Sequence, residues 1–92
     1  ADYSTAELVG IFRKMATDAD YAVGAVDVEL AQIFAAAGQR KGFGNARYAR
    51  TLLELAVSRH ALRLGGDDIA GLDHDTLTTL TAADITSAAA LL

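Results

Sequence analysis

The sequence contains no cysteine, no proline and no tryptophan among its 92 residues. The absence of cysteine excludes disulfides, thiolate metal sites and a cysteine nucleophile, and it suits a reducing compartment; we expect a cytoplasmic protein. No apolar run approaches the ~20 residues that a membrane-spanning helix needs, so we expect no membrane partner. The first residues, ADYSTAEL, lack the basic and apolar regions of a signal peptide, and we expect none.

What the sequence does contain is one small hydrophobic domain with an uneven charge. Since 52% of the residues are hydrophobic and 22% are charged, we predict a single globular domain over residues 1–92. The net charge of −4 argues against nucleic acid as a partner. Four of the eight basic residues nevertheless fall within eleven positions, and they are Arg40, Lys41, Arg47 and Arg50.

Helical periodicity and capping residues predict four helices. STAE at residues 4–7 forms a capping box, and apolar residues at helical spacing follow it. We expect Asp27 to cap the second helix, Asn45 the third, and Thr81, within TAAD, the fourth. The predicted helices span residues 5–18, 28–38, 46–64 and 82–91.

Two short segments favour strands rather than helices. Residues 21–26 (YAVGAV) and 76–81 (TLTTLT) are rich in strand-forming residues and could pair as a two-stranded patch. Two such strands are only marginally stable alone, so we treat them as an addition to a helical core. We therefore predict an all-α fold, a small four-helix domain, with a polar loop over residues 65–76.

The sequence shows no catalytic motif, and we assign no catalytic residue. GFGNAR at residues 42–47 has arginine where a dinucleotide-binding loop has its third glycine. His60 falls on the apolar face of the third helix, where we expect a partly buried packing residue. His74 lies between Asp73 and Asp75, but this spacing lacks the glycine and terminal glutamate of an EF-hand. We expect a solvated acidic loop there, and no metal.

The basic entrance of the third helix is the candidate site. A helix N-terminus favours an anion, and Gly44 and Asn45 would let the chain approach one closely. Arg47 lies in the first turn, where a cation is unfavourable unless a negatively charged ligand compensates it. Arg50 lies one turn further on. Two explanations remain open: the arginines face a phosphate, or they pair with acids of this chain, as Arg50 could with Glu54.

Three stretches of the chain resemble, in their order and spacing, the C-terminal lid of an AAA+ ATPase. They are DYSTAELVGIF at residues 2–12, FGNARYARTLLELAVSRHALRL at residues 43–64 and LTTLTAADI at residues 77–85. The resemblance is to the CbbX/CfqX-like branch, which includes red-type Rubisco activases, stage V sporulation protein K-like ATPases and EccA-like ATPases of type VII secretion.

This resemblance implies roles for particular residues and partners. Arg47 would be the sensor-2 arginine, which reaches the nucleotide phosphates, with Gly44, Asn45 and Arg50 in supporting positions. ATP or ADP with Mg²⁺ would be held by the P-loop core domain of the same protein, so this chain alone would neither hydrolyse ATP nor bind it well. Neighbouring subunits in a ring, expected to be a hexamer, and a protein substrate that the motor remodels would be the other partners.

Two other functions remain open on the sequence alone. A free-standing helical module could bind a partner protein through an apolar or basic face. For a lid separated from its core, we expect exposed residues such as Phe43 and Tyr48, near the nucleotide side, to form an apolar patch and to cause weak self-association at high concentration. Nucleic-acid binding has only four clustered basic residues in its favour, within an acidic domain. The lid is the preferred hypothesis because the anomalous charge of Arg47 and the resemblance lead to the same residue.

Overall fold

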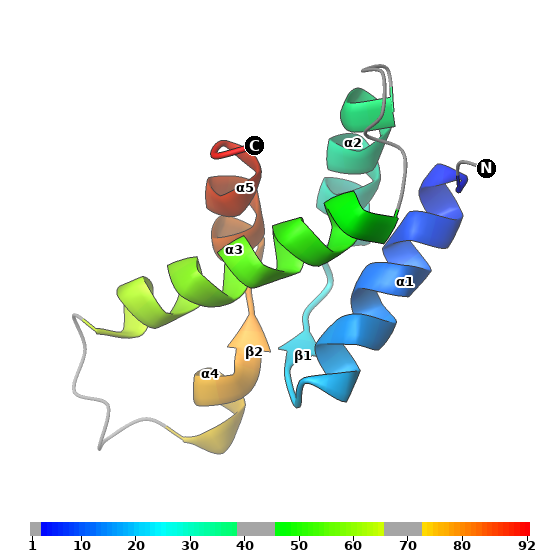
Figure 1. Ribbon diagram of the computed structural model, residues 1–92. Coiled ribbons are helices and arrows are strands. Elements are labelled where there is room, and N and C mark those ends of the chain that lie inside the picture. The colour runs from blue at the N-terminus through cyan, green and yellow to red at the C-terminus, as the bar shows by residue number, and fades with distance from the viewer. Residues whose placement is uncertain (1–2, 39–45, 66–72) are drawn as a thin grey trace.

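The computed structural model describes residues 3–38, 46–65 and 73–92 (Figure 1). Within these ranges the predicted all-α fold with a small β patch is confirmed. Each helix there is too short or too polar to traverse a lipid bilayer. The helices are α1 (Thr5–Asp18), α2 (Asp27–Gly38), α3 (Ala46–Leu64), α4 (His74–Thr78) and α5 (Ala82–Ala89), and the strands are β1 (Ala22–Val23) and β2 (Thr79–Leu80).

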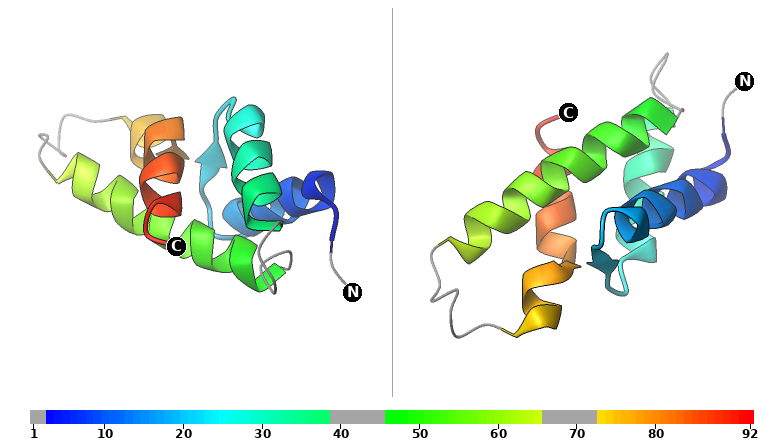
Figure 2. Two further views of the ribbon diagram at one scale, coloured as in Figure 1. Left: turned by 90° about the horizontal axis from the view of Figure 1, so that it is seen from above. Right: turned by 60° about the horizontal axis from the view of Figure 1, so that its bottom comes forward.

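The two strands decide how the helices lie relative to one another. β1 pairs with β2 in parallel, with Ala22 opposite Thr79 and Val23 opposite Leu80. Each strand leads into a helix, β1 into α2 and β2 into α5, so α2 and α5 run side by side in the same direction (Figure 1). The long helix α3 crosses this pair and packs most extensively against α5, while α1 packs against α2 and α3 (Figure 2).

The segment before β2 departs from the prediction. The sequence predicted a loop over residues 65–76 and a strand over residues 76–81. Both predictions are wrong for the residues that form the short helix α4, His74–Thr78. Asp73 caps this helix by accepting a hydrogen bond from the Thr76 amide at 2.8 Å. The alternating pattern of TLTTLT also fits one helical turn followed by a two-residue strand, and the Asp73 cap favours the helical turn.

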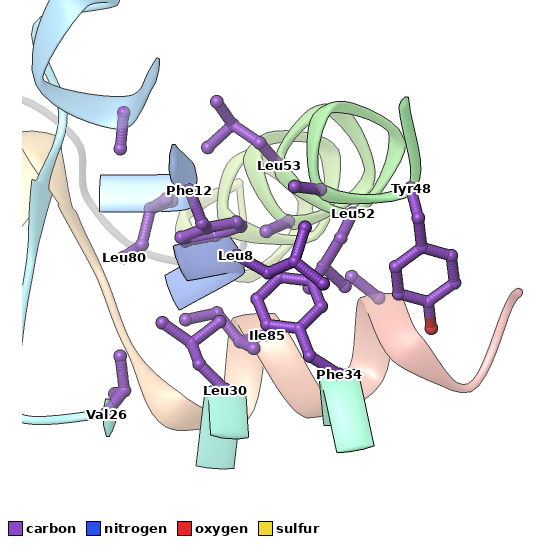
Figure 3. Close-up of a cluster of buried hydrophobic side chains, with 14 of the residues drawn as sticks. Leu8, Phe12, Val26, Leu30, Phe34, Tyr48, Leu52, Leu53, Leu80 and Ile85 are labelled. Carbon is purple, nitrogen blue, oxygen red and sulfur yellow. The ribbon is translucent and has the colours of Figure 1, made fainter. Parts of the chain in front are cut away.

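One hydrophobic core joins α1, α2, α3 and α5 (Figure 3). Phe34 of α2 lies at its centre, with ring centroids 6.4 Å from Phe12 and 5.9 Å from Tyr48 in edge contacts. Tyr48 is only 8% exposed, so the prediction that it is exposed is wrong. It follows Arg47 by one residue, and the ~100° step of a helix turns it from the solvent side towards the core. Phe43 lies outside the described residues.

Helix α1 ends in a left-handed residue that is not glycine. Asp20 has a φ of 67°. Two hydrogen bonds close the helix around it: the Asp20 amide donates to the Thr17 carbonyl at 3.0 Å, and the Tyr21 amide donates to the Ala16 carbonyl at 2.8 Å. This pair of bonds is a Schellman motif, which reverses the chain and directs it into β1.

Asp20→Val should lower the free energy of unfolding by about 1–2 kcal/mol, because a β-branched residue is disfavoured in the left-handed region. Asp20→Gly is the matched control, since glycine adopts this conformation without a steric cost, and it should leave stability unchanged or raised. Urea unfolding followed by circular dichroism measures both. Equal losses for the two variants would show that backbone conformation at this position is unimportant.

Candidate functional site

Arg47 lies in the first turn of α3, and its side chain is exposed. Its backbone carbonyl accepts a hydrogen bond from the Thr51 hydroxyl at 3.0 Å. The first turn of α3 carries no acidic residue, and no ion pair among the described residues involves Arg47. A cation at this end of a helix costs about 0.3–1 kcal/mol unless an anion offsets it. Gly44 and Asn45, the neighbouring candidates, lie outside the described residues.

Arg50 faces a different surface from Arg47. It lines an open groove of about 430 Å³ between the end of α1 and the middle of α3, and Arg47 is not among the lining residues. Glu54 lines the same groove, but in the described part of the chain no ion pair joins it to Arg50. Asp18, on the opposite side, pairs with Lys14 at 3.1 Å. Arg50 therefore lies beside acidic side chains of both α1 and α3, one turn along the helix from Arg47.

A buried polar cluster lies at the other end of α3, and the sequence did not reveal it. Arg63 donates two hydrogen bonds to the carboxylate of Asp84, from Nε at 2.9 Å and from Nη2 at 3.1 Å. His60 Nδ1 lies 3.2 Å from Asp84 Oδ2. The side chains of His60 and Asp84 are only 3% and 2% exposed. We call His60, Arg63 and Asp84 the His60 cluster.

Two backbone groups, together with a contact of 3.1 Å between Arg63 Nη2 and His60 Nδ1, complete the hydrogen bonding of the His60 cluster. The Thr81 amide donates to Asp84 Oδ2 at 3.0 Å, as part of the capping box that starts α5. His60 Nε2 lies 2.7 Å from the Leu77 carbonyl of α4. Because a carbonyl only accepts, Nε2 must carry a proton. The cluster thus joins the end of α3 to α4 and to the start of α5.

The geometry excludes a catalytic role for the His60–Asp84 pair as it stands. In a serine hydrolase triad, a carboxylate orients one nitrogen of a histidine and the nucleophile hydroxyl lies at the other nitrogen. Here the other nitrogen of His60 is occupied by the Leu77 carbonyl. The predicted burial of His60 is confirmed, and its ring packs edge-on against Tyr21 with centroids 5.9 Å apart. The sequence did not indicate that both ring nitrogens of His60 also have polar partners. Its partner Asp84 lies 24 residues along the chain, so no local spacing indicates the pair.

The His60 cluster should make stability depend on pH through Asp84. Burial raises the pKa of Asp84, but hydrogen bonds from Arg63 and the Thr81 amide, the charge of Arg63 and the contact with His60 outweigh burial, and the net pKa is lowered. A carboxyl whose pKa is lower in the folded state stabilises the fold above its unfolded pKa, and loses this contribution as pH falls through the folded value.

We therefore expect the contribution of Asp84 to be constant from neutral pH to about pH 5 and to fall progressively below that value. Asp84→Asn lacks this titration, so its free energy of unfolding should change less between pH 4.5 and pH 2.5 than that of the parent. Urea unfolding at a series of pH values measures the difference. Parallel curves for the two proteins would mean that ionised Asp84 does not stabilise the fold.

These features define a small helical accessory domain with an exposed arginine at the start of its longest helix and a buried polar cluster at that helix's end. The chain belongs to the AAA lid domain family, whose model matches residues 4–91. It is therefore the lid of an AAA+ ATPase, and its partner within that protein is the AAA+ core domain. None of the curated proteins matches the sequence.

Proposed function

We propose that this lid closes over a nucleotide bound by the core domain, and that Arg47 is its sensor-2 arginine. The observation that carries the proposal is the exposed, cationic side chain in the first turn of α3, with no acidic partner among the described residues. A guanidinium is well suited to this role because its fork of N–H donors matches a phosphate. The γ-phosphate of ATP would supply the anion that the helix end lacks.

The wider proposal follows the sequence resemblance. The parent protein would belong to the CbbX/CfqX-like branch, bind ATP or ADP with Mg²⁺ through its core, assemble as a ring, expected to be a hexamer, and remodel a protein substrate. Gly44 and Asn45 would let the chain approach the phosphates closely, and Arg50 would support the interface with the core. The groove that Arg50 lines favours a protein contact over a phosphate contact for this residue.

The alternative function, a free-standing helical interaction module, has less support. It needs an apolar or basic face that a partner protein could cover, and Tyr48, which we expected to be exposed, is buried against Phe34. The large hydrophobic residues that are exposed in the described part of the chain are Tyr3, Val28, Leu62 and Leu91, which come from four different segments. Membership of the lid family also favours a partner within the same protein.

Arg47→Ala in the whole ATPase should lower kcat for ATP hydrolysis by roughly 10- to 150-fold. This range corresponds to the loss of one charge-assisted hydrogen bond of about 1.5–3 kcal/mol in the transition state. Steady-state kinetics with ATP measures the effect, and circular dichroism checks that the lid remains folded. Because Arg47 is exposed, the substitution should change stability by no more than about 0.5 kcal/mol.

Arg50→Ala is the matched control for this experiment. It removes the same kind of side chain from the same helix, one turn away, but from the groove beside α1. We expect a loss in kcat well below that of Arg47→Ala. Normal turnover in Arg47→Ala would refute the sensor-2 role, and equal losses in both variants would indicate a general electrostatic effect of the basic patch.

A further inference from the structure

The polar groups at the two ends of α3 differ in exposure: Arg47 at the start is exposed, whereas His60 near the end is buried. α3 is 19 residues long, with Arg47 exposed in its first turn and His60 and Arg63 in its last five residues. At 1.5 Å per residue, Arg47 and His60 lie roughly 20 Å apart along the helix axis. At that separation they share no direct contact, and α3 is the element that carries both of them.

The middle of α3 is held by contacts that have little directional preference. Its buried face there consists of alanine and leucine, which gain stability from burial in a way that depends weakly on orientation. Hydrophobic cores lose a unique arrangement before they lose stability. The residues of this face are Ala49, Leu52, Leu53 and Ala56.

The His60 cluster supplies the directional contacts that the middle of α3 lacks. Hydrogen bonds weaken steeply when their angles depart from the preferred range. Arg63 grips both oxygens of Asp84, and His60 reaches α5 through one ring nitrogen and α4 through the other. A rotation of α3 about its own axis would disrupt these contacts together, and the cost of leaving the buried His60 and Asp84 without them opposes the rotation.

We propose that the His60 cluster sets the rotation of α3 about its axis and thereby positions Arg47 towards the nucleotide. Side chains lie about 5–6 Å from a helix axis, so a 20° rotation moves the tip of Arg47 by about 2 Å. Misplacement of a catalytic group by 1 Å can cost about 100-fold in rate. His60, Arg63 and Asp84 are thus positioning residues, and this inference rests on the proposed role of Arg47.

The test is a double-mutant cycle in the whole ATPase, with Arg63→Lys, Arg47→Ala and the double variant. Arg63→Lys keeps the charge but loses the bidentate hydrogen bonding to the carboxylate of Asp84. We expect it to lower kcat about three- to tenfold when Arg47 is present, and by less than twofold when Arg47 is absent. Distant sites that act independently have additive effects, so this loss of effect is the signature of positioning. Equilibrium binding of a fluorescent, non-hydrolysable ATP analogue, which carries the γ-phosphate, gives a second readout, and Arg63→Lys should weaken it only when Arg47 is present.

Two further variants separate positioning from loss of stability. Asp84→Asn gives a second double-mutant cycle with Arg47→Ala. This cycle replaces the first one if the Arg63→Lys variant unfolds at the assay temperature. Leu30→Ala in α2 removes a fully buried residue outside the cluster, and should leave kcat within about twofold of the parent while the lid stays folded.

The outcomes distinguish this inference from the proposed function. If Arg47→Ala has no effect on kcat, the sensor-2 role fails and the positioning role fails with it. If Arg47→Ala impairs turnover but Arg63→Lys is harmless, or is equally harmful with and without Arg47, only the positioning role is overturned. If Leu30→Ala lowers kcat as much as Arg63→Lys at equal stability, the effect of the cluster is structural and the positioning role is also overturned.

Discussion

Asp84→Ala should lower the free energy of unfolding by about 3 kcal/mol. Hydrogen bonds to charged groups contribute about 1.5–3 kcal/mol each, and the buried Asp84 carboxylate accepts three of them, two from Arg63 and one from the Thr81 amide. The Arg63 side chain is 38% exposed, so water can replace part of what it loses, and we expect a total well below the sum of the three. A domain of 92 residues has a total stability of about 5–14 kcal/mol, so the substitution would remove a large share of it.

The size of this effect reflects three structural roles that Asp84 combines. It accepts two hydrogen bonds from Arg63, it contacts His60, and it accepts from the Thr81 amide in the capping box of α5. Asp84→Asn keeps a side-chain oxygen for the Thr81 amide but loses the charge, and should cost less than alanine. Asp75→Ala is the control, since Asp75 is exposed and should change stability by no more than about 0.5 kcal/mol. Urea unfolding at pH 7 ranks the three variants, and a loss below 1 kcal/mol for Asp84→Ala would show that the cluster adds little to stability.

The helix bounds could be predicted from sequence because local interactions determine them. Both expected capping boxes form: the Ser4 hydroxyl accepts from the Glu7 amide at 3.1 Å, and the Thr81 hydroxyl accepts from the Asp84 amide at 3.4 Å. Each box lies within four consecutive residues, so the sequence contains all of its parts. The first and third helices therefore span the predicted residues, 5–18 and 46–64.

The polar contacts between helices could not be predicted, because they depend on packing. Arg13 of α1 donates to Asp27 at 2.7 Å and to the carbonyls of Val23 and Gly24 at 3.2 and 3.0 Å, which ties α1 to the segment between β1 and α2. No spacing rule connects residues 10 to 14 positions apart across a turn. In the His60 cluster, Asp84 lies 21 to 24 positions along the chain from its two side-chain partners. The cluster could not be predicted either, because no spacing rule connects residues so far apart.

In the candidate site, too, the local position of a residue could be predicted from the sequence, but its neighbours from other helices could not. The sequence placed Arg47 in the first turn of the third helix, and that position is confirmed. It predicted a supporting role for Arg50, because residues three apart on a helix share a face, and left open whether Arg50 faces a phosphate or pairs with Glu54. Only the packing of α1 beside α3 places Arg50 in a groove with Asp18 and Glu54. The surroundings of an exposed arginine depend on the adjacent helix, which periodicity does not describe.

Phe34→Ala should lower the free energy of unfolding by about 3–5 kcal/mol, the other large effect that we expect. Phe34 is 1% exposed, and its ring makes edge contacts with Phe12 of α1 and Tyr48 of α3. Alanine would leave a cavity at the point where three helices meet, and it would also remove two aromatic contacts of about 0.5–1.5 kcal/mol each. Phe34→Leu retains most of the volume and should cost less than about 1.5 kcal/mol beyond the lost ring contacts.

Phe34→Ala should also lower the local stability of the start of α3, where Arg47 lies. Tyr48 is the buried residue next to Arg47, and the Phe34 ring is the aromatic neighbour that packs against it within the described residues. Once that ring is removed, local opening of the first turns of α3 should cost less free energy than opening of its centre. Hydrogen exchange should therefore accelerate more at the amides of residues 49–52 than at residues 56–60. Uniform acceleration along α3 would mean that Phe34 stabilises the whole domain without a particular effect on the end that presents Arg47.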